Sequence, residues 1–369
     1  MEPRKVAYVT PLYFDDTSCI GGGERYPLNV AMGVAAGSRG EFAVDLISFG
    51  PNPGRRPISP GVDLVILRPS NRPANPLDVV SWDLPAALAD ADLVHIHSAY
   101  CRTAEVGLLV AKQRRLPVCI TDHGGYSSGL GNGVGFLELA DRIISNSDFG
   151  GSLYKTTTPV IVVKGGVDAT HFTPPPIGSP RDRLLYVGRL LPHKGIDTLI
   201  AATPPDLKLT VCGRPYHAGY FELLQRLAIG KDVEFVTGAD DDAILALYRR
   251  AWVNVLPSVY QDCYGGTHVA PELMGFTLQE AMACGAPAIC SRVGAMPEYI
   301  EHGVNGFVFD TPAELSGQLR ALAGNPRLVA KMGRAARRVA EREYDKDVVG
   351  AKVAAIYRGL LAKSEEVAA

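Results

Sequence analysis

Residues 184–202 read LLYVGRLLPHKGIDTLIAA, and this stretch decides the fold class. Its first four residues form an apolar run, which is typical of a strand buried on both faces of a parallel sheet. A turn containing Gly188 and Pro192 follows, and the residues from Gly195 to Ala202 have the apolar spacing of a helix. A strand, a turn and a helix in this order are the repeating unit of an α/β protein.

The same alternation runs through the rest of the chain. In the first half we expect strands at Lys5–Thr10, Phe42–Ser48, Asp63–Arg68, Asp92–His97, Val118–Thr121, Arg142–Ser145 and Val160–Val163. Helices are expected there near Arg25–Ala36, Val79–Ala89, Arg102–Lys112 and Asp148–Lys155. In the second half the expected strands are Leu184–Val187, Leu207–Cys212, Val233–Val236, Val253–Leu256 and Ala288–Cys290. The expected helices are near Gly195–Ala202, His217–Ile229, Asp241–Ala251, Phe276–Ala283, Pro312–Ala323, Leu328–Glu343 and Asp347–Ala362. Two such series predict two doubly wound parallel sheets, that is, two Rossmann-like domains.

A proline-rich segment separates the two series. Residues 173–180 read TPPPIGSP, and such segments are stiff connectors between domains. We therefore predict an N-terminal domain over residues 1–172 and a C-terminal domain over residues 173–346. Ligands of open α/β sheets bind at the carboxyl ends of the strands, so we expect a ligand in a cleft between two facing domains.

Length and composition agree with this organisation and exclude several classes of protein. At ~150 residues per domain, 369 residues suffice for two domains. The 37 basic and 39 acidic residues give a formal net charge of -2, which is unfavourable for nucleic-acid binding. The 7 cysteines include no CxxC pair, which argues against a zinc ribbon or disulfide framework and favours a reducing, cytoplasmic setting. No apolar run is long enough to span a bilayer, so we expect no transmembrane anchor and leave peripheral membrane contact open.

Three segments carry residues suited to phosphate and sugar chemistry, and the first is Gly21-Gly22-Gly23. It follows the first expected strand and opens a helix. Glycine permits a positive φ and a close approach of the backbone, and the N–H groups of a helix N-terminus bind anions. The alternative is a tight turn with no ligand. The spacing differs from GxGxxG, so a nicotinamide cofactor is not supported.

The second segment runs from Gly188 to Gly195, directly after an expected strand. Arg189 can bind a diphosphate in a bidentate manner, and Lys194 can act as a point charge on it. The alternative is a pair of surface cations, the usual place for these side chains. The segment lacks the GxxxxGK[ST] pattern of an ATPase phosphate loop.

The third segment contains two carboxylates separated by seven residues, Glu272 in a loop and Glu280 in the helix that follows. Glu280 is suited to the two hydroxyls of a ribose. The N–H groups of Gly275, Phe276 and Thr277 open the helix and can donate to sugar oxygens. The alternative for Glu280 is an acid in the first turn that stabilises the helix dipole.

Together, Arg189 with Lys194, Glu272 with Glu280, and the run AMACGAP at 281–287 resemble the retaining glycosyltransferases of family 4, which have the GT-B fold. The segments VHIH at 94–97, TDHG at 121–124 and GGVD at 165–168 resemble their counterparts in the same family. The resemblance implies that a nucleotide-diphosphate sugar binds to the C-terminal domain and the acceptor to the N-terminal domain. It also implies that the terminal helix, about residues 347–369, packs back on the first domain.

The resemblance assigns roles to single residues. It implies that Arg189 and Lys194 bind the diphosphate, Glu280 the ribose and Glu272 the donor sugar. His123 is expected beside the sugar and Gly22 near the phosphate. The residues expected in catalysis are His123, Arg189, Lys194 and Glu272. The residues expected to bind the donor are Gly22, Gly23, Gly188, Arg189, Lys194, Glu272, Gly275, Phe276, Thr277 and Glu280.

No cofactor and no metal are expected, because the family resembled binds the diphosphate with cations and helix N-termini. His95 and His97 share one face of a strand, but no third ligand with metal-site spacing accompanies them. Two departures from the family pattern are Met274, where an aromatic residue is usual, and an insertion over residues 260–271, which could shape the acceptor side or close over the donor.

The implied function is transfer of a sugar from a nucleotide-diphosphate sugar to an acceptor hydroxyl with retention at the anomeric carbon. UDP is the favoured nucleotide and GDP the alternative. The product would be a polysaccharide, a glycoconjugate or a glycosylated natural product, and a soluble acceptor is favoured. Alternatives are a GT-B sugar-nucleotide epimerase or phosphorylase, and a non-catalytic subunit that binds nucleotide sugars. The oligomeric state stays open.

Overall fold

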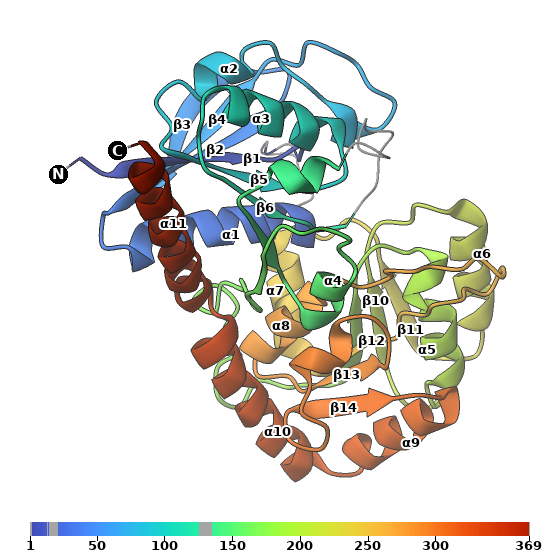
Figure 1. Cartoon of the computed structure of the whole chain (residues 1–369). Helices are drawn as coiled ribbons and strands as arrows, with labels where there is room; N and C mark the ends of the chain where they lie inside the picture. The colour runs from blue at the N-terminus through green and yellow to red at the C-terminus, as the bar shows by residue number, and fades with distance from the viewer. Residues whose placement is uncertain (1, 13, 15–20, 125–134, 369) are drawn as a thin grey trace. The chain divides into compact units, whose positions relative to one another are not determined.

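The computed structural model describes residues 2–12, 14, 21–124 and 135–368. The chain forms two compact units (Figure 1). The first unit contains Met1–Gly166 together with Asp345–Ala369, and the second unit contains Val167–Tyr344. The second unit is therefore inserted into the sequence of the first. Ala369, the last residue of the predicted terminal helix, lies outside the described residues.

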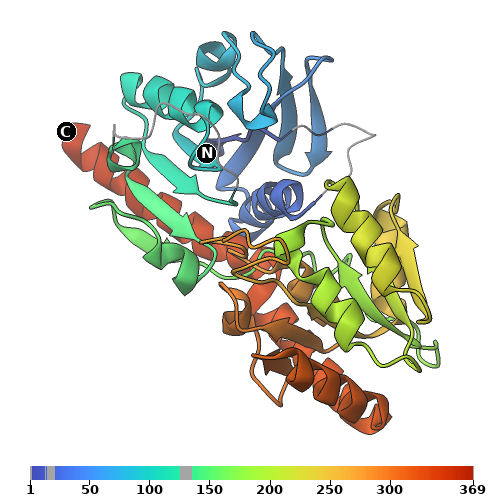
Figure 2. The same cartoon turned by 90° about the vertical axis from the view of Figure 1, so that its right-hand side faces the viewer.

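The first unit is built on one sheet with the strand order β3-β4-β2-β1-β5-β6-β7-β8. Its strands are β1 Arg4–Val9, β2 Phe42–Phe49, β3 Gly54–Ser59, β4 Val62–Leu67, β5 Leu93–His97, β6 Val118–Thr121, β7 Arg142–Ser145 and β8 Val160–Val162. Its helices are α1 Gly22–Gly37, α2 Leu84–Ala87, α3 Arg102–Gln113, α4 Asp148–Ser152 and α11 Lys346–Ala368. All neighbouring strands are parallel except β3 and β4. The connection from β1 leads to β2, toward the β3 edge of the sheet, whereas the connection from β5 leads to β6, toward the β8 edge. Right-handed crossovers therefore place α1 and α3 on opposite faces (Figure 2).

The second unit is built on an all-parallel sheet with the order β11-β10-β9-β12-β13-β14. Its strands are β9 Arg183–Val187, β10 Leu209–Cys212, β11 Val233–Val236, β12 Ala251–Leu256, β13 Ala288–Ser291 and β14 Gly306–Phe309. Its helices are α5 Ile196–Ala202, α6 Ala218–Leu227, α7 Asp241–Arg250, α8 Phe276–Ala283, α9 Pro312–Ala323 and α10 Pro326–Val339. The winding reverses between β9 and β12, which are neighbours. Ligands of such sheets bind at this reversal, beyond the carboxyl ends of the strands.

Three elements differ from the sequence prediction. The edge strand β3 was not expected, because it is exposed and polar and contains Pro57, so it lacks the apolar run of a central strand. The short strand β14 was not expected either. The predicted helix Val79–Ala89 is reduced to α2, because Pro85 is tolerated only in the first turn of a helix.

The chain passes from the first unit to the second between Gly166 and Val167, ahead of the proline-rich segment. Residues just after this point already bond within the second unit: Val167 donates its N–H to the carbonyl of Tyr344. Arg337 donates to the carbonyls of Ala169 and Phe172. The proline-rich segment also belongs to the second unit, where Arg249 donates to the Thr173 carbonyl over 3.0 Å. These contacts explain why the division precedes the predicted boundary at residue 172.

Helix α11 crosses α1 and packs against it in the first unit (Figure 1). The two backbones approach closely where glycines meet. A Cβ atom added to Gly350 would lie 2.0 Å from the carbonyl carbon of Gly33, and one added to Gly33 would lie 2.0 Å from the carbonyl oxygen of Lys346. No side chain fits at either position without moving a helix.

We expect Gly350→Ala to lower the free energy of unfolding of the first unit by ~1–3 kcal/mol, the usual cost of overpacking. Gly359→Ala on the same helix is the matched control, because nothing lies within 4 Å of its added Cβ. That control should be neutral or stabilising by up to ~1 kcal/mol, because alanine has the higher helix propensity. Urea unfolding followed by circular dichroism measures both variants. Equal transition midpoints for the two variants would contradict the close packing of α1 and α11.

Candidate functional site

The loops after β9 and β12 meet in the second unit, and they bring the two predicted segments together. Lys194 ends a short 3-10 turn, Pro192–Lys194, that follows β9. The next residue, Gly195, has a φ of 63°, and a Cβ there would lie 2.1 Å from the carbonyl oxygen of Pro257 after β12. Glycine at 195 thus lets the two loops touch, which fixes where Lys194 lies.

Lys194 and Glu272 form an ion pair at this point. The distance from Lys194 Nζ to Glu272 Oε1 is 2.5 Å, and both side chains are only 11% exposed. The Ser258 hydroxyl donates to the same carboxylate oxygen over 2.8 Å. Two charges this far from water need each other's compensation, so the pair is held in one geometry. Both residues were predicted, but their direct contact was not.

Arg189 lies in the same loop but is exposed. Its charge is felt at His193, whose pKa is lowered to about 4, first by burial and then by the nearby Lys194. His268 and Arg189 lower it further, whereas Glu272 acts in the opposite direction. Arg189 and Lys194 thus both lie close enough to His193 for their charges to act on its ring.

Glu280 lies deeper in the second unit than the sequence suggested. Gly275 has a φ of 62°, so α8 begins at Phe276 and Glu280 falls after its first turn. The carboxylate is 3% exposed and accepts a hydrogen bond of 2.7 Å from the Tyr248 hydroxyl. The alternative interpretation as a first-turn acid is therefore wrong. Tyr248 was not predicted, because a tyrosine on an apolar helix gives no signal distinct from a core residue.

The start of α8 also holds an unpartnered polar group. The Thr277 hydroxyl is buried and has no hydrogen-bond partner among the residues that the structure describes. Buried hydroxyls are normally paired, so this one marks a place where a ligand or water can bond.

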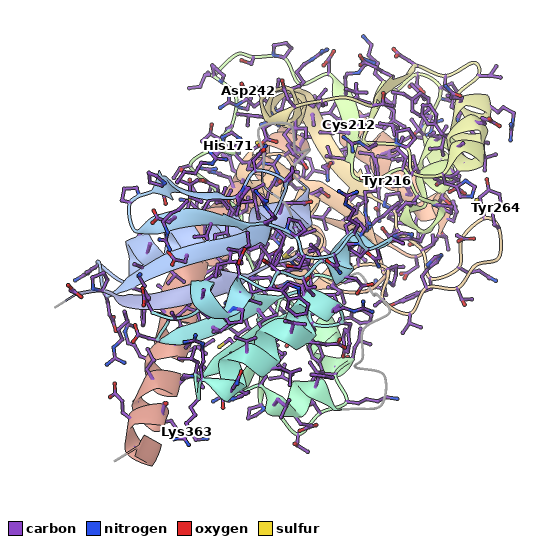
Figure 3. The ribbon with its side chains drawn as sticks, turned by 90° about the horizontal axis from the view of Figure 1, so that it is seen from above. His171, Cys212, Tyr216, Asp242, Tyr264 and Lys363 are labelled. Carbon is purple, nitrogen blue, oxygen red and sulfur yellow. The ribbon has the colours of Figure 1, made fainter. Side chains whose placement is uncertain are left out.

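The insertion at 260–271, which directly precedes Glu272, forms a small hairpin. Gln261 and Thr267 pair across it. The Asp262 carboxylate accepts the N–H groups of Tyr264 and Gly266, and bonds the His268 ring at 2.8 Å. Tyr264, labelled in Figure 3, packs its ring against His217 near the start of α6, with 5.5 Å between ring centres. The hairpin is tied to the loop after β9, because Val259, which precedes the hairpin, donates its N–H to the His193 carbonyl.

In the first unit, Gly21-Gly22-Gly23 opens α1 but adopts no positive φ. Gly21 is extended, with a φ of -93°, and its N–H donates to the Glu24 carboxylate over 3.0 Å. The positive φ that glycine permits is therefore not used at these three positions. What they supply is a helix N-terminus without side chains.

His123 follows β6 and pairs with His97 at the end of β5, with 2.9 Å between His97 Nδ1 and His123 Nε2. Burial lowers the pKa of His123 to about 3. His95 has both ring nitrogens engaged, by Tyr357 and Thr121, so it cannot ligate a metal through a free nitrogen. Among the described residues, no group of three or more His, Cys, Asp or Glu side chains could hold a metal ion. His97 was not predicted as a site residue.

Comparison with known proteins gives the family. The sequence model described as "Glycosyl transferases group 1" matches residues 168–339, and that described as "Glycosyltransferase Family 4" matches residues 20–171. The chain belongs to the family 4 glycosyltransferases. The predicted family is thereby confirmed.

The relatives of this glycosyltransferase carry different names. It is 28% identical to the D-inositol 3-phosphate glycosyltransferase of Mycolicibacterium vanbaalenii, over 89% of this chain and 85% of that protein. It is 30% identical to the glycogen synthase of Mycobacterium tuberculosis, over 54% of this chain and 48% of that protein. These names show a glycosyltransferase and leave its substrates open.

The solved structures show the fold. The sucrose-phosphate synthase of Thermosynechococcus elongatus has a TM-score of 0.75 at 21% identity and covers 98% of this chain and 100% of its own. Anabaena HepE, in complex with UDP and glucose, has a TM-score of 0.71 at 18% identity. The match covers 96% of this chain and 100% of the HepE chain. The predicted GT-B fold class with two Rossmann-like sheets is confirmed. Within the described part of this glycosyltransferase, no helix is both long and apolar enough to cross a bilayer.

Proposed function

We propose that this glycosyltransferase moves a sugar from a nucleotide-diphosphate sugar to an acceptor hydroxyl, with retention at the anomeric carbon. The observation that carries the proposal is the Lys194–Glu272 ion pair at the reversal of the second sheet, where a diphosphate and a sugar can be bound side by side. UDP is the favoured nucleotide, because HepE was solved with UDP and glucose, and GDP is the alternative.

In this proposal the second unit binds the donor. Arg189 and Lys194 hold the diphosphate, with the backbone around Gly188. The N–H groups at Gly275 and Phe276 and the unpartnered Thr277 hydroxyl bond phosphate or sugar oxygens. Glu272 binds the sugar and Glu280 the ribose. Gly22, Gly23 and His123 act from the acceptor-binding domain, and no metal is required.

Retention follows from a front-face reaction. The bond between the anomeric carbon and the diphosphate oxygen breaks, and its electron pair stays on the diphosphate. The acceptor oxygen then bonds the same face of the carbon and passes its proton to a diphosphate oxygen. Glu272 is tied to Lys194 and Ser258, which suits a binding role better than that of a free nucleophile. The protein contributes positioning and charge stabilisation.

A thermal-shift screen of nucleoside diphosphates and their sugars tests the proposal. A ligand at 100 times its dissociation constant adds ~2.7 kcal/mol of stability, so a true donor raises the midpoint clearly. Release of free UDP only with an acceptor present would separate a transferase from an epimerase, and dependence on inorganic phosphate would indicate a phosphorylase. Binding without any turnover would indicate a non-catalytic subunit. No shift with any nucleoside diphosphate would overturn the proposal.

Glu280→Gln tests the ribose contact. We expect it to weaken UDP binding by ~1.5–3 kcal/mol, the range for hydrogen bonds to charged groups. The preference for UDP over its 2′-deoxy analogue should disappear, because an amide oxygen accepts less strongly than a carboxylate. Tyr248→Phe is the matched control, since it removes the hydroxyl that bonds Glu280 but leaves the carboxylate. Calorimetry measures the preference for UDP over its 2′-deoxy analogue in both variants. If Glu280→Gln keeps this preference and Tyr248→Phe loses it, Tyr248 and not Glu280 binds the ribose.

A further inference from the structure

Two histidines, the buried His97 and the half-buried His123, form a bonded pair at the carboxyl ends of β5 and β6. The planes of the two rings make an angle of 6°, and their centres are 5.2 Å apart. His97 Nδ1 lies 2.9 Å from His123 Nε2. His97 is fully buried, and its ring also packs on Tyr8 at 4.8 Å and His95 at 4.3 Å. His95 is itself fixed by Tyr357 and Thr121. The His97 ring therefore has no room to turn away from His123.

Both rings are neutral around pH 7. The pKa of His123 is lowered to about 3 by burial. The pKa of His97 lies well below its usual range, chiefly because of burial and then because of His95 and His123. A neutral imidazole has one N–H and one bare nitrogen. The bond between the rings needs one of each, so the tautomer of one histidine dictates that of the other.

Two tautomer combinations satisfy this bond, and they differ at the two ring nitrogens that lie outside it. His97 Nε2 and His123 Nδ1 are both buried, and neither has a partner among the described residues. If His97 donates from Nδ1, the unpartnered N–H lies on His123 Nδ1. If His123 donates from Nε2, the unpartnered N–H lies on His97 Nε2 instead. An unpaired N–H in the dry interior is costly.

The difference in burial favours the first arrangement. His97 is 0% exposed, whereas His123 is only half-buried. Both nitrogens are buried, but His123 as a residue is partly exposed, so an N–H on His123 lies nearer to a place where a ligand can bind than one on His97 does. We propose that His97 is a positioning residue that fixes His123 as the Nδ1–H tautomer, so that His123 donates a hydrogen bond to a sugar oxygen. The proposal rests on the proposed function, because it takes a sugar as the ligand of His123.

Three substitutions of His97 distinguish a positioning role from direct contact with the ligand and from a purely structural role. Asparagine carries its amide at the δ position and can still bond His123 Nε2, whereas glutamine carries it at the ε position and cannot. Leucine offers neither atom. UDP release from UDP-glucose, measured with an acceptor present, should fall by about 10- to 100-fold in His97→Gln and His97→Leu, as for the loss of one hydrogen bond in the transition state. His97→Asn should stay within a few-fold of the wild type. The dissociation constant of UDP should not change in any of them.

Other patterns would overturn the proposal. If His97→Gln keeps its turnover and His97→Asn does not, His97 Nε2 contacts the ligand directly. If all three variants lose turnover in proportion to their loss of thermal stability, His97 is only a core residue. A wild-type protein that neither binds nor cleaves any nucleotide sugar would instead remove the proposed function.

Nitrogen-15 NMR of histidine-labelled protein tests the tautomer without any substrate, because protonated and bare ring nitrogens resonate far apart. The whole chain is used. We expect a protonated Nδ1 on His123 in the wild type and in His97→Asn, and a mixture of tautomers in His97→Leu. A wild-type His123 protonated at Nε2 would overturn the proposal whatever the activity data show.

Discussion

Lys194→Ala should lower turnover by ~10²- to 10³-fold while the protein still folds, by analogy with the loss of one preorganised oxyanion donor. Negative charge builds on the diphosphate as the glycosidic bond breaks, and a cation fixed beforehand stabilises that state more than the ground state. The structure adds a second effect. Lys194 also compensates the Glu272 carboxylate, which is 11% exposed and would be left with Ser258 as its partner. Arg189 is exposed and outside this pair, so Arg189→Ala should cost less than Lys194→Ala.

Turnover at saturating donor is the measurement. The double variant should lose less than the product of the two single losses, because both cations act on one leaving group. Arg250→Ala is the control, since its exposed ion pair with Asp182 lies by the start of β12, at the other end of the strand from the site. It should change stability by at most ~1 kcal/mol and leave turnover unchanged. Near-wild-type turnover in Lys194→Ala would remove the diphosphate assignment.

His123→Ala should lower turnover by roughly 10²-fold and leave UDP binding intact, because UDP is assigned to the second unit and His123 belongs to the first. A contact with the sugar that strengthens in the transition state affects turnover more than binding. His123→Gln is an informative companion: it keeps an amide at the position that bonds His97 but lacks an atom in place of Nδ1. It should therefore lose as much turnover as the alanine variant. Parallel losses of turnover and UDP affinity would indicate a structural role.

The sequence predicted the central strands well because buried parallel strands are continuous apolar runs. Strands β6 and β7 begin and end where they were expected. The edge strand β3 carries no such signal, since it faces solvent and pairs with only one neighbour. The length of α2 depends on Pro85, whose effect is local and could have been anticipated.

Contacts within the site were harder to predict than its residues. Lys194 and Glu272 lie 78 positions apart, and they meet because β9 and β12 are neighbours in the sheet although β10 and β11 come between them in the sequence. The partners of the predicted residues were missed for a different reason. Tyr248 and His97 sit in apolar segments, where one polar atom does not reveal what it bonds.

During synthesis, the second unit is complete before the first, because the first unit needs residues 345–369. Residues 167–344 have all emerged before α11 does, so the second unit can fold while the first unit still lacks a helix. That helix carries Gly350, against which α1 packs, and Tyr357, whose hydroxyl bonds both His95 and Tyr8. Until α11 emerges, the nascent first unit exposes the face of α1 and the polar core that α11 covers. A nascent chain halted when residue 344 has just left the ribosome would thus present a complete second unit joined to an incomplete first unit.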